Sequence, residues 1–204
     1  MAITFKETYK GNSILTSKEK GLGCNTEILD KIRGFMNYTT QIHNKVLVVR
    51  LDLRYPKNYH APEDNSHISE FTSKYIKQLK REGYDPYYLW VREQSREKHQ
   101  HYHLMIAVDG NKMQFPHKLM TTAEKHWAST IGSDQDGLVD HCNKSRQGES
   151  QPNSYRLRRN DPDFDQVYDE CHKRCSYLAK ENTKGCAPKR AREVGCSRIP
   201  RSIY

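Results

Sequence analysis

The chain has 204 residues, enough for one compact domain with a substantial core, and its net charge of +9 favours a polyanionic partner, with nucleic acid ahead of a membrane surface. Its hydrophobic fraction of 35% is low for a globular domain, so part of the chain is expected to be polar loop or tail. No apolar run approaches membrane-spanning length and the first residues contain no signal-peptide segment, which excludes a membrane-spanning protein and predicts a cytoplasmic location.

The first half of the chain predicts an arm, two helices and a strand. Residues 1–24 have little periodicity and are expected to form an N-terminal arm or an irregular first strand. One helix should begin after Asn25, which suits its N-cap, and a second should span about residues 66–82. Between them, residues 46–55 alternate as a strand does, with one apolar side and one charged side facing solvent or a ligand. The charged side consists of Arg50, Asp52 and Arg54.

The second half predicts a β-hairpin, two more helices and polar connections. Pro116 should start one helix, and the pair Asp161-Pro162 should start another that runs to about residue 182. Residues 143–160 are basic and aperiodic and are expected to form a mobile loop. Residues 185–204 are expected to form a basic C-terminal tail.

The order of these elements predicts the fold class. Antiparallel pairing of about five strands, with the helices packed mainly on one face of the sheet, gives an α+β fold, of which a ferredoxin-like arrangement is the commonest form. With no internal repeat, we expect one domain over residues 1–204.

The hairpin offers a set of metal ligands. Its first strand ends at Glu93, and its second carries His101 and His103, which point to one face because strand side chains alternate. Two imidazoles and a carboxylate suit Mg²⁺ or Mn²⁺, with positions left open for water and phosphate, better than a closed thiolate zinc site. His99 extends the same pattern upstream, so the ligand pair could be shifted by two residues. The alternative is a solvated, histidine-rich strand edge.

A tyrosine in the last predicted helix is the candidate nucleophile. Tyr177 lies roughly 130° from the centre of the apolar stripe of that helix, on the side of Lys173, Lys180 and Lys184. Neighbouring ammonium groups favour the phenolate, which is the better nucleophile. A metal held by the hairpin would then polarise a phosphodiester that Tyr177 attacks, giving a phosphotyrosine and a free 3′-hydroxyl. An ordinary exposed tyrosine is the alternative.

These motifs, in this order, resemble those of the HUH endonucleases that initiate rolling-circle replication. Residues 48–56, VVRLDLRYP, look like the first motif of that family, which helps to bind DNA. The triplet His101-Tyr102-His103 matches its His-hydrophobic-His motif, and Glu93 has the spacing of the third ligand in viral members. The run Tyr177-Leu178-Ala179-Lys180 matches its Y-x-x-K motif with a single tyrosine. The chain is similar overall to replication proteins of the filamentous-phage type found in bacterial prophages.

The resemblance implies a Rep-type fold and a metal-dependent, site-specific nicking and strand-transfer activity that starts replication from a phosphotyrosine. The substrate would be single-stranded or hairpin DNA at a replication origin, in the cytoplasm of a bacterial host. Since no P-loop helicase segment follows the motifs, a separate helicase would unwind the duplex. Lys180 would stabilise the phenolate or the developing charge on the phosphate.

Seven residues are candidate DNA contacts, most of them because they are basic: Arg50, Asp52, Arg54, Arg156, Arg158, Arg159 and Lys184. Three alternatives to a replication initiator remain open. The first is a transposase or relaxase with the same chemistry, and the second is a non-catalytic DNA-binding regulator. The third is a structural zinc protein that uses His141, Cys142, Cys171 and Cys175. The six cysteines have no framework spacing, so we otherwise expect reduced, mostly buried thiols.

Overall fold

A central antiparallel sheet organises the molecule. The computed structural model describes residues 2–94, 100–145, 147–181, 188 and 191–200. The strands follow one another across the sheet in the order β10-β6-β7-β5-β8, and β9 also pairs with β5. Their bounds are β5 Lys45–Leu53, β6 Tyr87–Glu93, β7 His101–Asp109, β8 Val139–Asp140, β9 Ser154–Arg158 and β10 Val194–Cys196.

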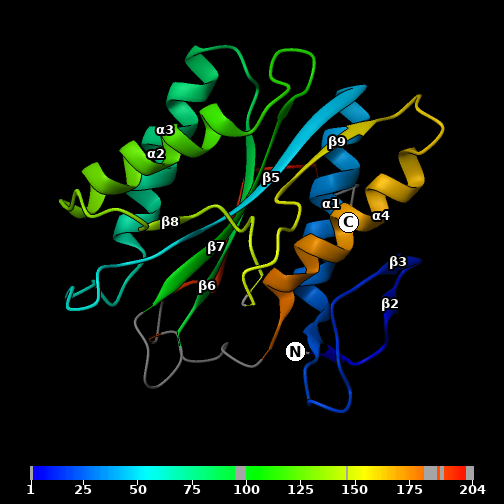
Figure 1. Ribbon diagram of the computed structural model, residues 1–204, viewed down its shortest axis with the longest axis horizontal. Coiled ribbons are helices and arrows are strands. Elements are labelled where there is room, and N and C mark those ends of the chain that lie inside the picture. The colour runs from blue at the N-terminus through cyan, green and yellow to red at the C-terminus, as the bar shows by residue number, and fades with distance from the viewer. Residues whose placement is uncertain (1, 95–99, 146, 182–187, 189–190, 201–204) are drawn as a thin grey trace.

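Four helices cover both faces of this sheet (Figure 1). Helices α2 (Ser66–Arg81) and α3 (His117–Ile131) lie on one face, and α1 (Thr26–Ile42) and α4 (Phe164–Cys175) on the other. The expected α+β class and antiparallel sheet are therefore confirmed. The expectation of helices mainly on one face is wrong.

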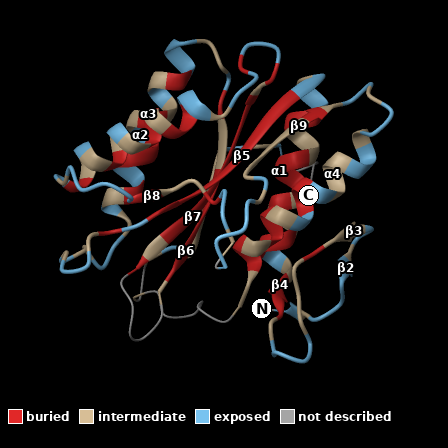
Figure 2. Cartoon of the chain, in the orientation of Figure 1, coloured by how far each residue is buried: buried red, intermediate tan, exposed pale blue. Residues whose placement is uncertain are grey.

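The alternation of β5 explains why both faces are covered. Leu47 and Val49 join the core beneath α2 and α3, whereas Val46 and Val48 join the core beneath α1 and α4. A strand with apolar residues on both sides is stable only when both sides are buried. Figure 2 shows the result, with buried residues along the central strands and on the inner sides of the helices.

The N-terminal segment packs against the α1–α4 face through very short strands. Strand β1 (Ile3–Thr4) pairs with β4 (Cys24–Asn25), and β2 (Thr8–Tyr9) pairs with β3 (Asn12–Ser13). The Asn25 side chain accepts hydrogen bonds from the backbone of Glu27 and Ile28, which confirms it as the N-cap of α1. Ile14 and Cys24 are buried, so this segment contributes to the core rather than forming a free arm.

Two basic segments form strands that the sequence pattern did not predict. Residues 154–158 of the expected mobile loop form β9, which pairs with β5 along residues 45–49. Residues 194–196 of the expected tail form β10, which pairs with β6. Polar edge strands have only one paired neighbour, so their backbone pairing does not require an apolar pattern.

The last helix is shorter than its periodicity predicts. Helix α4 ends at Cys175, and the 3₁₀ turn η1 (Ser176–Ala179) follows. The Ser176 hydroxyl donates to the carbonyl of Lys173 and accepts from the backbone of Leu15, which fixes the turn against the N-terminal segment. Tyr177 therefore lies on a tight turn instead of a long helix.

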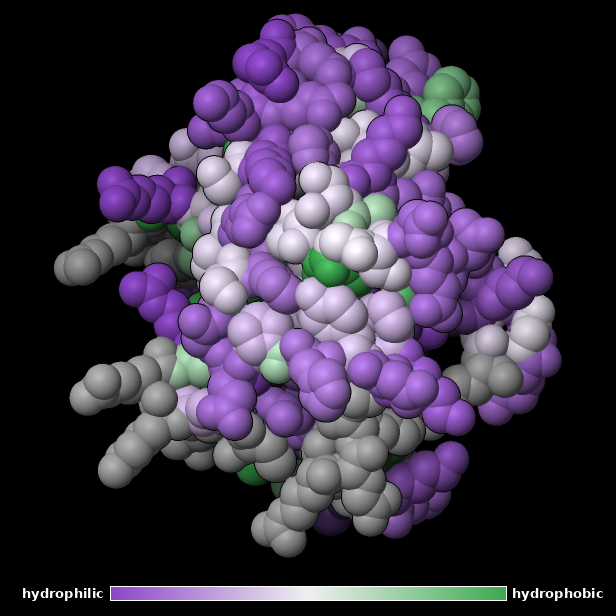
Figure 3. All heavy atoms as spheres, turned by 90° about the vertical axis from the view of Figure 1, so that its left-hand side faces the viewer, coloured by the Kyte–Doolittle hydropathy of each residue, from purple (hydrophilic) through white to green (hydrophobic). Residues whose placement is uncertain are grey.

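The outer surface over α2 and α3 is largely hydrophilic. Figure 3 shows this side with polar groups over most of it and small apolar areas near its centre and at its upper right edge. Among the described residues, no helix is both long and apolar enough to span a bilayer.

Candidate active site

The β6–β7 hairpin brings the three predicted ligands together. Glu93 is the register partner of His101, and Val91 is the partner of His103. Partner side chains on one face of an antiparallel pair lie about 5 Å apart at Cβ. The hairpin therefore places all three side chains on the face covered by α1 and α4. His99, the other histidine of the motif, lies outside the described residues.

The donor atoms of this cluster converge. Nε2 of His101 lies 2.9 Å from Oε2 of Glu93, and Nε2 of His103 lies 2.8 Å from the same oxygen. One ligand atom from each of the three residues lies within 4.8 Å of the others. Glu93 and His103 are buried, whereas the His101 side chain is 26% exposed and leaves the cluster open on one side. Two nitrogens and one oxygen with an open side fit a divalent ion.

A buried aspartate supports His103 from behind. Asp52 is the register partner of His103 across β5 and β7, and its Oδ1 lies 2.7 Å from Nδ1 of the imidazole. A carboxylate at the second nitrogen of a ligand histidine fixes the ring orientation and leaves the other nitrogen for the metal. The structure thus adds a partner to the ligand set predicted from the sequence.

Arg50 completes a buried charge network with Asp52. Its Nη2 lies 3.3 Å from both carboxylate oxygens. Burial by itself would raise the pKa of Asp52, but His103 and Arg50 outweigh burial and hold that pKa below its ordinary value. Burial by itself would lower the pKa of His103, but Asp52 and Glu93 outweigh it and raise that pKa.

This network corrects the expected orientation of the charged side of β5. Arg50 is 4% exposed and Asp52 is 6% exposed, so of the two expected surroundings, solvent or a ligand, they do not have the first. Each is buried because the other, together with His103, compensates its charge. Arg54 is exposed as predicted and forms an ion pair with Asp140.

The ring of Tyr177 packs against the ligand cluster. Its ring centroid lies 5.2 Å from that of His103, with the two ring planes 86° apart. The guanidinium carbon of Arg50 lies 4.1 Å from the tyrosine ring centroid, and Nζ of Lys180 lies 4.2 Å from it. Cations over an aromatic face are attracted by its quadrupole. The turn η1 therefore brings together the candidate nucleophile and the candidate metal ligands from segments about 80 residues apart.

The remaining candidate DNA contacts are not part of this cluster. Arg158 pairs with Lys45, roughly seven residues along β5 from Asp52, or about 23 Å away. Arg158 also contacts Asp161, and Arg159 donates to backbone carbonyls at the end of α1. Arg156 lies on the same edge strand, opposite Leu47. Lys184 lies outside the described residues.

The alternative zinc cluster does not form. In the described part of the chain, Glu93, His101 and His103 are the one group of histidine, cysteine and acidic side chains with metal-site geometry. His141 instead contacts Glu124 at 2.7 Å. Cys171 and Cys175 lie in the core beneath α1.

The sequence contained a signal for the roles of Arg50 and Asp52, which the prediction of an outward-facing charged side overlooked. The two residues are spaced by two on β5, as the histidines are on β7, and so share one face. Pairing the two strands in register would have placed Asp52 opposite His103.

Comparison with known proteins places the chain in a family. The family described as the YagK/YfjJ C-terminal domain matches residues 4–197. The chain is also 27% identical over 198 residues to a protein of Escherichia coli strain K12 whose name is uncharacterized protein YfjJ. That similarity covers 83% of this chain and 92% of the Escherichia coli protein. Because the family match extends over nearly the whole sequence, this protein belongs to the YagK/YfjJ C-terminal domain family.

Proposed function

We propose that this protein is a metal-dependent, single-tyrosine endonuclease of the HUH type, which nicks single-stranded DNA and transfers the strand. The observation that carries the proposal is the position of Tyr177, 5.2 Å from the ring of His103 in a cluster of two histidines and a glutamate. A nucleophilic tyrosine needs a phosphate held beside it, which is what this donor set is suited to do.

The proposed step begins with Tyr177. Its phenol loses a proton and the phenolate oxygen attacks the phosphorus of a phosphodiester, forming the phosphotyrosine bond. The bond from phosphorus to the 3′ oxygen breaks, and that oxygen takes up a proton to give a free 3′-hydroxyl. Attack of a 3′-hydroxyl on the phosphotyrosine reverses the step and joins a strand, releasing the phenol.

The neighbouring residues have separate tasks in this step. Glu93, His101 and His103 hold the ion, and the chemistry that a divalent ion supplies there is Lewis-acid polarisation of the scissile phosphodiester. Arg50 and Lys180 lie over the ring of Tyr177, where their positive charge would stabilise the negative charge that develops on the phosphate.

The proposed biological setting is the initiation of rolling-circle replication. The substrate is then single-stranded or hairpin DNA at an origin, with a separate helicase to unwind the duplex. The net charge of +9 supports a nucleic-acid substrate. A transposase or relaxase would use the same residues and differ in the DNA end that it recognises.

The test is formation of a covalent protein–DNA adduct. Labelled single-stranded DNA that contains the candidate origin is incubated with the protein and Mn²⁺, and the products are separated on a denaturing gel. We expect an adduct with the wild-type protein and none with Tyr177→Phe or with chelator. His101→Ala and His103→Ala should reduce the adduct at least about 100-fold while leaving much of the DNA affinity.

Tyr84→Phe is the matched control, because Tyr84 is also a tyrosine beside a lysine but has no metal cluster. Nζ of Lys118 lies 4.9 Å from its ring centroid. This variant should form the adduct as the wild type does. An adduct that persists in Tyr177→Phe would show that the nucleophile is another residue, and sequence-selective binding with no adduct in any variant would indicate a DNA-binding regulator.

A further inference from the structure

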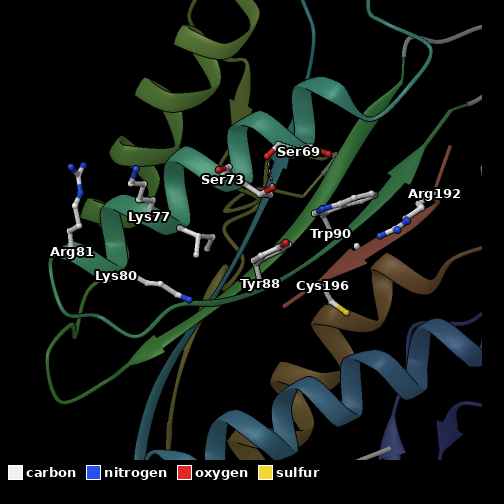
Figure 4. A pocket seen from close by; sticks show the side chains of 12 residues that line it. Ser69, Ser73, Lys77, Lys80, Arg81, Tyr88, Trp90, Arg192 and Cys196 are labelled. Carbon is white, nitrogen blue, oxygen red and sulfur yellow. Dashed lines mark hydrogen bonds between the residues drawn. The ribbon is translucent and has the colours of Figure 1, made fainter. Parts of the chain in front are cut away.

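A basic groove lies between α2 and the strands β6 and β10, and the nicking step does not use it. The cavity has a volume of about 580 Å³. Tyr88 and Trp90 line it from β6, as Figure 4 shows. Because strand side chains alternate, these rings point away from the face that holds Glu93. The groove is therefore distinct from the metal cluster and lies on the other side of the sheet.

The groove has a cationic rim. Four of the residues that line it are basic, and none is acidic; the basic residues are Lys77, Lys80, Arg81 and Arg192. All four are exposed, and none of them forms an ion pair within the residues that the structure describes. In Figure 4, Arg192 comes from the β10 side, and Lys77, Lys80 and Arg81 come from the last turns of α2. Uncompensated charge at both ends of a cavity favours an elongated polyanion over a single small anion.

The floor of the groove is aromatic. Tyr88 is half-buried, and Trp90 is largely covered by the backbone of β10. A Cβ at Gly195 would lie 2.3 Å from the indole ring, so only glycine lets β10 pass over Trp90. Because Trp90 is covered, Tyr88 is the ring that is open to a base. An aromatic ring beneath a basic rim is a combination that binds single-stranded nucleic acid, with a base stacked on the ring and phosphates at the cations.

The edge strand β10 joins the groove to the side of the candidate active site. The backbone of Arg92 donates to the carbonyl of Glu193, so residues 192–193 lie beside the end of β6 that carries Glu93. Arg192 also lines a second cavity of about 390 Å³ next to α1. Trp90 is three residues from Glu93, or about 10 Å along the strand. A strand leaving the active site could reach the groove by crossing this edge.

We propose that this groove binds a segment of single-stranded DNA outside the cleaved phosphodiester. The inference rests on the proposed nicking function for the identity of the strand. The groove then holds the substrate on one side of the sheet while Tyr177 acts on the other. Lys80 and Arg192 contact phosphates, and Tyr88 stacks on a base.

The experiment measures DNA binding without cleavage. Fluorescence anisotropy of a labelled, mixed-sequence single strand of about 30 nucleotides is followed in EDTA, at several salt concentrations, with the full chain. The double variant K80A/R192A should raise Kd about 10-fold and make the slope of log K against log salt shallower by about 1.4, the value for two lost phosphate contacts. Tyr88→Leu should raise Kd about fivefold with little change in that slope.

A second double variant controls for net charge. K18A/K20A also removes two positive charges, but from exposed lysines in the N-terminal segment, away from the groove. We expect it to change Kd less than about threefold. Equal losses in the two double variants, or no loss in K80A/R192A, would overturn the inference. Circular dichroism of each variant verifies that the fold is retained.

The adduct assay separates this inference from the proposed function. If the wild type forms the adduct and K80A/R192A binds DNA as tightly as the wild type, the groove assignment fails and the nicking function stands. If binding depends on the groove residues and no adduct forms, the groove stands as a nucleic-acid site and the nicking function fails.

Discussion

The same strands form both faces of the central sheet, but the two faces differ in the residues that they present. On the α2–α3 face, β5 presents Leu47, Val49, Leu51 and Leu53, and the core is apolar along the whole strand. On the α1–α4 face, β5 presents Val46 and Val48 and then changes to Arg50 and Asp52. Strand β7 changes in the same way, from Ala107 and Met105 to His103 and His101.

This difference shows how one sheet combines stability with chemistry. The apolar face is closed mainly by helix packing, and a buried cation on it, Arg92 of β6, donates to the backbone carbonyls of Glu63 and Asp64. The other face is half core and half charge network, and the network is stable because Arg50, Asp52 and His103 compensate one another. Substitutions on the apolar face should therefore reduce folding stability alone. Substitutions in the network should reduce metal binding and activity, and those that leave a buried charge without its partner should reduce stability as well.

The largest expected effect is on stability, at the centre of the apolar face. Trp127 is fully buried, its ring packs against those of Tyr55, Phe71 and Tyr102, and its Nε1 donates to the carbonyl of Arg54. Trp127→Ala should lower the free energy of unfolding by about 3–5 kcal/mol. Tyr177→Phe, on the other face, should lower it by about 0.5 kcal/mol or less. Urea denaturation of both variants measures the contrast, and similar losses would contradict it.

Metal binding should stabilise the charged half of the other face. At a Mn²⁺ concentration about 100 times Kd, the wild type should gain about 2.7 kcal/mol of unfolding free energy. His101→Ala should lose most of this gain, and since His101 is partly exposed its own folding cost is small. Titration calorimetry gives Kd, and urea denaturation with and without Mn²⁺ gives the gain. Equal stabilisation of both proteins would place the ion elsewhere.

A smaller effect is expected for the aspartate behind His103. Asp52→Asn removes the charge that lies 2.7 Å from Nδ1 of His103, and should weaken Mn²⁺ binding about 10- to 100-fold. Asp140 is the register partner of Asp52 on β8 and forms an ion pair with Arg54, so Asp140→Asn removes a nearby charge without touching the histidine. We expect Asp140→Asn to change Kd less than about threefold. If titration calorimetry gave the same rise in Kd for both variants, the loss of Mn²⁺ affinity would be due to general electrostatics and not to the orientation of His103.

Much of the local structure of the candidate site followed from the sequence. Side-chain alternation and the short turn predicted that Glu93, His101 and His103 would meet, and the hairpin register confirms that they do. The Asn25 cap is also confirmed. These features depend on contacts between residues fewer than about 12 apart, for which periodicity is informative.

The features that sequence patterns missed depend on distant contacts. The polar strand β9 exists because β5 offers it a free edge. Arg50 and Asp52 are buried because β7 brings His103 beside them and η1 covers them with Tyr177. The last helix ends early because Ser176 bonds to Leu15, which is 161 residues away. Charged or polar residues are predicted to be exposed unless the groups that pair with them are known. Those groups are identified only from the tertiary structure.

The smallest expected effect compares one histidine from each face. His172, on α4, is fully buried, and its Nδ1 donates to the carbonyl of Ser13. Burial lowers the pKa of His172. Between its ordinary pKa of about 6.5 and this lowered value, the unfolded chain binds a proton that the folded chain does not, so stability falls as the pH falls through that range. The slope is up to about 1.4 kcal/mol per pH unit.

His126, on α3, provides the comparison because it is only partly buried. Burial lowers its pKa as well, but its Nε2 contacts Gln78 near the surface, so water can hydrate the charged form. Unfolding free energies from urea curves between pH 7.5 and 5 should show a smaller acid-induced loss in His172→Asn than in the wild type. The loss in His126→Asn should be close to that of the wild type. The contrary result is a plot of unfolding free energy against pH that runs parallel in His172→Asn and the wild type. The buried histidine would then take up its proton in the folded protein, and the α1–α4 core would be less tightly packed around α4 than the contact with Ser13 indicates.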